Sequence, residues 1–179
     1  MKKSEIYVPF VPTPPRVVGC MLDMANVGRG DMVCDLGFGD GRILVAAASP
    51  PYNAKAVGVE HDKKRFHDAK RLVKHLGLEK SIELLYGDIM DFDVGDATVV
   101  TAYLLPNAND AVKPKLEKEL DTSARIVSHD YQFYGWKPSK KQELIVPTPW
   151  TFSYVPGSDK DAFGISHHYV YLYEMSKIR

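Results

Sequence analysis

The sequence has few cysteines, no excess charge of either sign and no long apolar run, and each absence excludes a class of protein. The two cysteines, Cys20 and Cys34, form neither a C-x-x-C pair nor a metal-binding spacing. Isolated thiols of this kind are typical of buried side chains in a reducing compartment, which favours a cytoplasmic location. Lys and Arg total 23 and Asp and Glu also total 23, so no net charge attracts the chain to nucleic acid.

No apolar segment approaches the length that crosses a membrane, and the opening MKKSEIYVPF lacks the apolar centre of a signal peptide. We therefore expect no membrane partner. The length of 179 residues fits one domain with a sizeable core, and no repeat or change of composition divides it. We predict a single domain over residues 1–179, of which residues 1–13 form an N-terminal arm.

Strand-like and helix-like segments alternate through most of the chain. The strand-like segments are residues 31–37, 54–60, 81–88, 97–105 and 124–131. The helix-like segments are residues 41–49, 61–77 and 107–120, preceded by a helix with Thr13 as N-cap and Pro14 as first residue. Alternation of this kind, with nearly all-apolar strands, predicts an α/β fold with a doubly wound, Rossmann-like, mostly parallel sheet covered on both faces.

The pattern changes from about residue 142. Residues 142–148, 150–155 and 167–175 are strand-like with no helix between them, and residues 156–164 are typical of a loop. Consecutive strands without a crossover helix predict a C-terminal antiparallel hairpin at one edge of the sheet.

The segment VCDLGFGDGRILV, residues 33–45, follows the first strand with three glycines and two aspartates. Glycine loops between a strand and a helix usually hold phosphate, which Asp35 and Asp40 would repel. The same carboxylates would attract a ligand that carries an ammonium and a sulfonium, as S-adenosylmethionine (SAM) does. We therefore predict that Gly37, Gly39 and Gly41 let the backbone approach SAM closely. The alternative is a tight turn in which Asp40 caps the helix.

Two further acids follow the next strands. Glu60 ends the second strand and is placed to accept hydrogen bonds from both ribose hydroxyls, the role of an acid about 20 residues after a Rossmann glycine loop. Asp88 follows the third strand and is predicted to accept from the adenine amino group, with Ile89 beside it. Taken singly, either acid would more often be a helix cap or a solvated charge; the combination of acids favours the nucleotide site.

The motifs DLGFGDGR, VGVE and YGDI resemble the first motifs of the seven-strand SAM-dependent methyltransferases. FVPTPPRVV, DATVVTAYLLPNAN, KPKLEKEL and ARIVSHDYQFYGWKP are similar to the small protein-lysine methyltransferases of archaea and to the mitochondrial lysine methyltransferases that modify carriers and ATP synthase. The resemblance implies a seven-stranded sheet, SAM as cofactor and lysine side chains of proteins as acceptors. Two departures are a phenylalanine, Phe10, where archaeal members often have tyrosine, and an apparent insertion at residues 147–166.

The resemblance also implies that the arm contacts the cofactor through Phe10, Pro12 and Thr13. We expect the arm to act as a lid over the methionine end of SAM; the alternative is a strap that only covers the sheet. Tyr103, at the end of the fourth strand, is the one candidate catalytic residue, either beside the sulfonium or bonded to the incoming amine. An aromatic packed under the next helix is an equal alternative for Tyr103.

The histidines are not predicted to bind metal. His129 and Asp130 end the fifth strand and could guide a cationic lysine, but a solvated role is favoured for His129. His167 and His168 have no metal-binding spacing and are interpreted as strand residues. We expect no metal.

The prediction is thus a SAM-dependent protein-lysine N-methyltransferase with protein substrates. Two alternatives remain: a methyltransferase for RNA or a small molecule on the same fold, or a SAM-binding protein without turnover. Neutral net charge disfavours nucleic acid as the partner.

Overall fold

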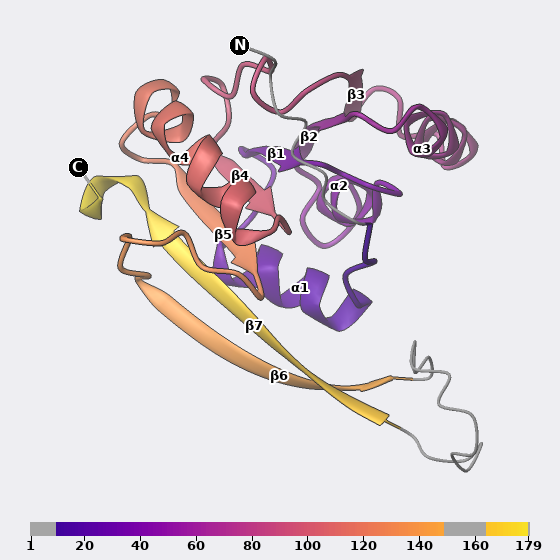
Figure 1. The fold of residues 1–179 in the computed structure, drawn as a ribbon. Helices are drawn as coiled ribbons and strands as arrows, with labels where there is room; N and C mark the ends of the chain where they lie inside the picture. The colour runs from indigo at the N-terminus through magenta and orange to yellow at the C-terminus, as the bar shows by residue number, and fades with distance from the viewer. Residues whose placement is uncertain (1–9, 149–163, 179) are drawn as a thin grey trace.

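The structure, a computed structural model, describes residues 10–148 and 164–178 (Figure 1). The strands are β1 (Met32–Leu36), β2 (Lys55–Glu60), β3 (Ile82–Tyr86), β4 (Val99–Ala102), β5 (Arg125–His129), β6 (Lys140–Thr148) and β7 (Gly164–Glu174). The helices are α1 (Pro15–Met24), α2 (Arg42–Ala48), α3 (Lys63–His75) and α4 (Pro106–Glu119), followed at the C-terminal end by the short 3-10 helix η1 (Met175–Lys177).

The strands form one seven-stranded sheet in the order β3-β2-β1-β4-β5-β7-β6. The first five strands in sequence pair in parallel. β7 is antiparallel to both β5 and β6. The predicted α/β fold is therefore confirmed, with a mostly parallel sheet and an antiparallel C-terminal hairpin.

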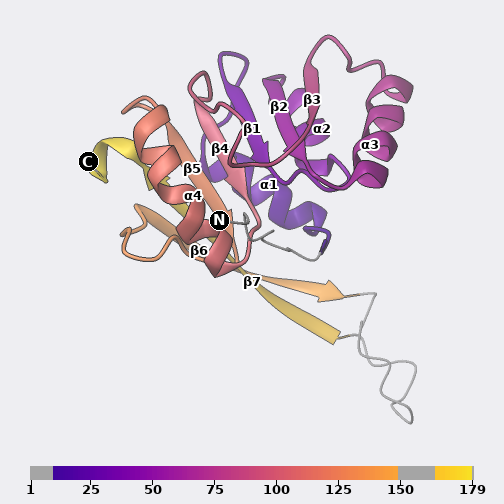
Figure 2. The ribbon, with the colours of Figure 1, turned by 45° about the horizontal axis from the view of Figure 1, so that its top comes forward.

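Helices cover both faces of the sheet (Figures 1 and 2). Because alternate residues of a strand point to opposite faces, each strand contributes to two cores. Val33, Val99 and Val127 pack with α1, α2 and α3 on one face. Cys34, Val100 and Ile126 pack with α4 on the other. Cys20 and Cys34 are both free thiols.

The hairpin of β6 and β7 extends past the rest of the sheet, as Figure 2 shows. The pairing of β7 with β5 ends at Val170, opposite His129. Residues 164–169 of β7 pair only with β6. The strand expected at residues 150–155 lies outside the described residues.

Two local predictions are wrong. The N-cap of α1 is Pro14, and Thr13 is buried with its hydroxyl bonded to His129. The helical spacing of residues 61–77 predicts Leu72 and Leu76 on one apolar face with Ala69 and Val73. Both leucines are exposed, because the contact of α3 with the sheet centres on Ala69 and Val73.

Among the described residues, none of the helices is long and apolar enough to cross a membrane.

Candidate functional site

The carboxyl ends of β1, β2, β4 and β5 lie side by side along one border of the sheet, as parallel pairing requires. This border, formed by strand ends and not by an edge strand, is the carboxyl edge. The strand order reverses at β1, which lies between β2 and β4. Ligands of open α/β sheets bind outside the carboxyl ends of the strands at such a reversal. The structure therefore brings the acids predicted from sequence, Asp35 and Glu60, to one edge.

The glycine loop, residues 37–41, joins β1 to α2. Gly37, Gly39 and Gly41 have φ angles of 78°, 59° and 82°. Residues with a side chain rarely adopt this left-handed backbone, so glycine is required at each position. Gly39 also lies against the ring of Phe10, which would be 2.3 Å from an added Cβ. The loop is thus both a tight turn and a surface of bare backbone.

Asp35 is buried at the end of β1, and the Thr101 hydroxyl donates a hydrogen bond of 2.8 Å to it. Burial raises the pKa of Asp35 to about 7; the hydrogen bond from Thr101 opposes the rise, and the charges of Glu60 and Asp40 add to it. A cation placed beside this carboxyl would favour its ionised form.

Asp40 is paired with a cation from its own chain, which the charge argument from sequence did not anticipate. Two nitrogens of the Arg42 guanidinium, Nε and Nη2, donate to the Asp40 carboxylate, the nearest at 2.5 Å. The third, Nη1, donates a hydrogen bond of 2.7 Å to the carbonyl of Thr13. Arg42 therefore neutralises much of the charge of Asp40 and fastens the arm to the glycine loop. The signal available in the sequence was the arginine two positions after the aspartate.

Glu60 is buried at the end of β2 and accepts three hydrogen bonds. The Gly39 N–H donates to Oε2 (2.9 Å), while the Asp62 N–H (2.8 Å) and the Arg65 guanidinium (3.2 Å) donate to Oε1. These contacts fix the carboxylate against the glycine loop.

Asp88 and Ile89 follow β3 at the same edge. The Asp88 side chain is exposed and accepts a hydrogen bond of 2.9 Å from the N–H of Met90. Ile89 is half-buried against the core on the α4 side. The Gly87 N–H donates to the carbonyl of Glu60 (3.1 Å), which holds this turn beside the end of β2.

The described part of the arm, from Phe10, crosses this edge. The Phe10 ring packs on Gly39, and the Arg65 guanidinium lies 5.4 Å from its centroid. Pro12 is half-buried and Thr13 is buried. The Thr13 hydroxyl is 3.2 Å from Nδ1 of His129. The arm thus spans from the glycine loop to the end of β5.

A second group of polar side chains, the histidine cluster, consists of His129, Asp130 and His168. His129 Nε2 lies 2.9 Å from His168 Nδ1, and Asp130 Oδ2 lies 3.3 Å and 3.4 Å from these two nitrogens. The sequence favoured a solvated His129, which is wrong because His129 is fully buried. His168 is a strand residue, as expected, and the antiparallel pairing of β7 with β5 places it beside His129.

Tyr103 joins the histidine cluster from β4. Its ring centroid lies 3.9 Å from that of His129, and its hydroxyl donates a hydrogen bond of 3.1 Å to Asp130. Burial and the charge of Asp130 raise the pKa of the Tyr103 hydroxyl, so it stays protonated at neutral pH. Burial lowers the pKa of His129 to about 4, which keeps the imidazole neutral.

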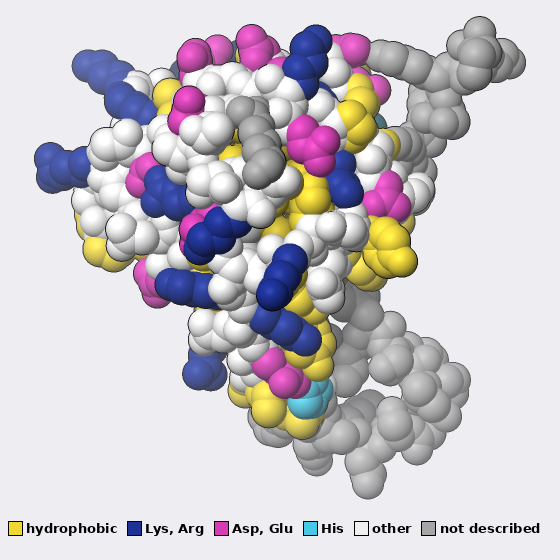
Figure 3. Space-filling view, turned by 90° about the vertical axis from the view of Figure 1, so that its left-hand side faces the viewer, with side chains coloured by type: hydrophobic (Ala, Val, Ile, Leu, Met, Phe, Trp, Pro, Cys, Tyr) yellow, Lys and Arg dark blue, Asp and Glu magenta, His cyan; other side chains and the backbone are white. Residues whose placement is uncertain are grey.

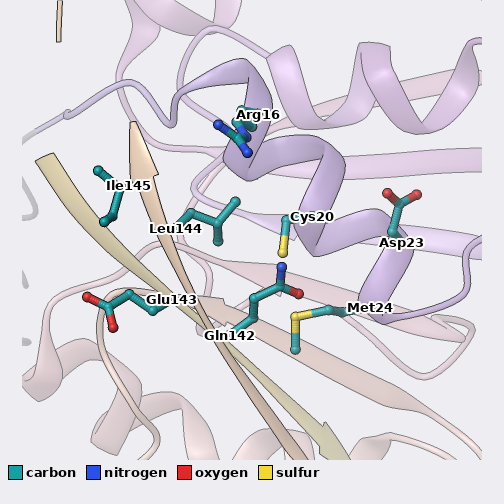
Figure 4. Close-up of a pocket in the computed structure, with 8 residues that line it drawn as sticks. All are labelled: Arg16, Cys20, Asp23, Met24, Gln142, Glu143, Leu144 and Ile145. Carbon is teal, nitrogen blue, oxygen red and sulfur yellow. The ribbon is translucent and has the colours of Figure 1, made fainter. Parts of the chain in front are cut away.

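A cavity of about 620 Å³ lies away from the glycine loop, between α1 and β6 (Figure 4). Its lining comes from Arg16, Cys20, Asp23 and Met24 of α1 and from residues 142–145 of β6. None of these residues belongs to the edge that carries Asp35 and Glu60.

Residues 35–140 match the ANTKMT methyltransferase domain family. A protein-lysine N-methyltransferase of Saccharolobus islandicus is 44% identical over 134 residues, which cover 75% of this chain and 83% of that protein. The adenine nucleotide translocase lysine N-methyltransferase of Mus musculus is 30% identical over 134 residues; these are 75% of this chain but only 58% of the mouse protein.

Among solved structures, an RNA methyltransferase of Salinibacter ruber in complex with S-adenosyl-L-homocysteine superposes with a TM-score of 0.76 at 33% identity. The superposition covers 92% of this chain and 94% of that one.

Proposed function

Because the chain belongs to the ANTKMT methyltransferase domain family, we propose that it transfers a methyl group from SAM to lysine side chains of proteins. The observation that carries this proposal is the 44% identity with a protein-lysine N-methyltransferase over three quarters of the chain. The enzyme is a SAM-dependent methyltransferase, and the protein acceptor is the proposed part.

The residues at the carboxyl edge fit SAM. The glycine loop offers bare backbone, and Asp35 is a buried acid whose ionised form a cationic ligand would favour. We assign the methionine end of SAM to Asp35 and the glycine loop, the ribose to Glu60, and the adenine to Asp88 and Ile89. When bound, SAM supplies an electrophilic methyl group on a positively charged sulfur.

The hydrogen bonds of Glu60 sharpen its assignment. A carboxylate has about four lone-pair sites, and three are taken by the N–H donors of Gly39, Asp62 and Arg65. The remaining site is on Oε2, beside the glycine loop. Glu60 therefore accepts from one ribose hydroxyl, and its other bonds hold the glycine loop in place.

Tyr103 is assigned to the acceptor amine. A lysine must lose a proton before it attacks, because its unperturbed pKa is about 10.4, and the like charge of the nearby sulfonium lowers that pKa. The Tyr103 hydroxyl gives its hydrogen to Asp130, which leaves its oxygen lone pairs free to accept from the amine N–H. Such a bond directs the nitrogen lone pair and requires no strong protein base.

The arm is assigned as a cover for the cofactor. Its described residues reach the glycine loop through Phe10 and the end of β5 through Thr13. A segment that reaches from the glycine loop to the end of β5 excludes water from the site when SAM is bound. Residues 1–9 of the predicted arm lie outside the described residues.

RNA is the second candidate acceptor, because the Salinibacter ruber structure at 33% identity is an RNA methyltransferase. The surface charge gives little support to RNA as the acceptor. Lys and Arg side chains are interspersed with Asp and Glu side chains on the face in Figure 3, and the chain has no net charge.

The test is transfer from methyl-labelled SAM into separate pools of protein and RNA, followed by mapping of the labelled groups. The proposal predicts methyl-lysine in protein. Glu60→Ala should abolish the signal, and Glu83→Ala, which removes an exposed carboxylate of β3, is the matched control. Label in RNA alone would support the second candidate, and SAM binding without transfer would support a protein that does not turn over.

The two free cysteines favour a cytoplasmic location, which subcellular fractionation would test.

A further inference from the structure

The histidine cluster brings three potential ligand atoms together at the point where the β6–β7 hairpin leaves the sheet. These atoms are Nε2 of His129, Nδ1 of His168 and Oδ2 of Asp130, separated by 2.9, 3.3 and 3.4 Å. Each can present a lone pair to the space between them. Two arrangements satisfy these atoms: a hydrogen bond in which one neutral imidazole donates its N–H to the other, or a metal ion that accepts all three lone pairs.

The spacing is that of a metal site. At metal–ligand bond lengths of about 2.0–2.1 Å and coordination angles of about 90–110°, neighbouring ligand atoms lie about 2.9–3.4 Å apart. The three observed distances all fall in this range. We propose that His129, Asp130 and His168 bind one divalent transition-metal ion, for which Zn²⁺ is the best fit.

The atoms behind the three ligands are already held in place. The second nitrogen of His129 lies 3.2 Å from the Thr13 hydroxyl, and that of His168 lies 2.8 Å from the Ser166 hydroxyl. Oδ1 of Asp130 accepts a hydrogen bond of 2.9 Å from the N–H of Tyr169. Partners of this kind orient the ligands of metal sites and set the histidine tautomers.

The backbone of Asp130 supports the same conclusion. Its φ of 58° is left-handed, a conformation that residues other than glycine rarely adopt outside special sites. This conformation, with the bond from the Asp130 N–H to the Tyr169 carbonyl (2.7 Å), turns the carboxylate toward the two histidines.

The ligand set indicates the class of ion. Two imidazoles and one carboxylate suit Zn²⁺ and neighbouring transition metals, whereas Mg²⁺ and Ca²⁺ prefer oxygen ligands. His129 is fully buried, but the side chains of His168 and Asp130 are 13% and 22% exposed, which gives an ion a path from solvent. A bound ion would join β5 to β7 and, through Thr13, to the arm.

The experiment measures Zn²⁺ binding to tag-free protein, first stripped with a chelator, by calorimetry, and Co²⁺ binding by its visible absorption. The proposal predicts one ion per chain, a Co²⁺ spectrum with nitrogen and oxygen ligands, and a higher melting temperature with Zn²⁺. Loss of a residue that only hydrogen-bonds to a metal ligand typically costs about 10–100-fold in metal affinity. His168 is itself a proposed ligand, so His168→Ala should weaken Zn²⁺ binding by more than about 100-fold.

His167→Ala is the matched control. His167 is the preceding residue of the same strand, but its side chain is about half exposed and bonds to Glu143. This variant should bind Zn²⁺ as the wild type does. Ser166→Ala removes only the hydroxyl that hydrogen-bonds to His168, and it should weaken Zn²⁺ binding by about tenfold. This variant provides a second test of the site if His168→Ala does not fold.

Wild-type protein that binds no Zn²⁺ or Co²⁺, or equal binding by the His167→Ala and His168→Ala variants, would overturn the site. Loss of methyl transfer in His168→Ala without metal binding by the wild type would also overturn it, and would assign the cluster to positioning of the acceptor. Because metal binding is measured without SAM, its failure is distinct from failure of the proposed transferase activity.

Discussion

The glycine loop and the histidine cluster lie along the same edge of the sheet, yet the chain assembles them in different ways. Asp35, the glycine loop and Glu60 come from one βαβ unit of adjacent parallel strands. The histidine cluster joins the end of β5 to β7, 39 residues away in sequence, and Thr13 contacts it from 116 residues away. The first region is set by local backbone geometry, and the second depends on the register of an antiparallel hairpin.

This difference implies that the two regions can be disrupted independently. Changes in the glycine loop should alter SAM binding, while changes near the histidine cluster should alter transfer or metal binding with little effect on SAM.

The largest expected effect is that of Glu60→Ala. This substitution removes the acceptor of the Gly39 N–H as well as the contact assigned to the ribose. Hydrogen bonds to charged groups contribute about 1.5–3 kcal/mol each, so loss of the one bond to the ribose should weaken SAM binding by about 10- to 150-fold. Calorimetry with SAM would measure this, with Glu83→Ala as control. Unchanged affinity would remove Glu60 from the site.

The next effect is a pH dependence of SAM affinity. The pKa of Asp35 is raised to about 7, and a cation beside it favours the ionised form, so affinity should fall about tenfold from about pH 8 to about pH 6. Titrations in buffers of different ionisation enthalpy would show proton release on binding. In Asp35→Asn the pH dependence should be absent; a wild-type affinity that is flat with pH would contradict the assignment.

Ionisation of Asp35 should affect the stability of the unliganded protein in the opposite direction. SAM affinity should rise with pH, whereas the free energy of unfolding should fall with pH. Its folded-state pKa of about 7 lies above the ordinary value of 3.8, so the neutral carboxyl stabilises the fold fully below about pH 4. That contribution is lost as the pH rises through about 7. Asp35→Asn should therefore lose less stability than the wild type between about pH 5 and about pH 8 in urea denaturation.

A smaller effect is expected for Tyr103→Phe. The ring and its packing on His129 remain, and only the hydroxyl is lost. A hydrogen bond contributes about 1 kcal/mol, so the rate of transfer should fall about fivefold while SAM affinity stays unchanged. Single-turnover kinetics would separate the two quantities. Equal rates for the variant and the wild type would leave Tyr103 as a packing residue.

The smallest effect concerns the arm. Phe10→Ala removes the ring that packs on Gly39 and contacts Arg65, a contact at a partly exposed site. Cation–π contacts of this kind contribute about 0.5–1 kcal/mol, so SAM affinity should fall about two- to fivefold with a near-native melting temperature. Val11→Ala, at the adjacent exposed position, is the control. A large loss of thermal stability would instead indicate a structural strap.

Much of the geometry around the glycine loop could be predicted from sequence because its signals are short-range. The left-handed angles of Gly37, Gly39 and Gly41 need glycine, and a strand that ends in Glu60 next to them places an acid at a known position. Arg42 was missed because its partner Asp40 was assigned to the ligand, although only two residues separate them. Thr13 was assigned as a helix cap because nothing local in the sequence reveals its contact with His129.

The α/β order of elements, the glycine loop and the acids at the ends of β1 and β2 follow from local patterns, because periodicity and backbone sterics act over a few residues. The meeting of His129, Asp130 and His168 follows from long-range packing. Their meeting requires β7 to pair with β5 in one register, and a shift of one residue would turn His168 to the other face of the sheet. No local pattern encodes that register, since it depends on how the hairpin packs against the rest of the sheet.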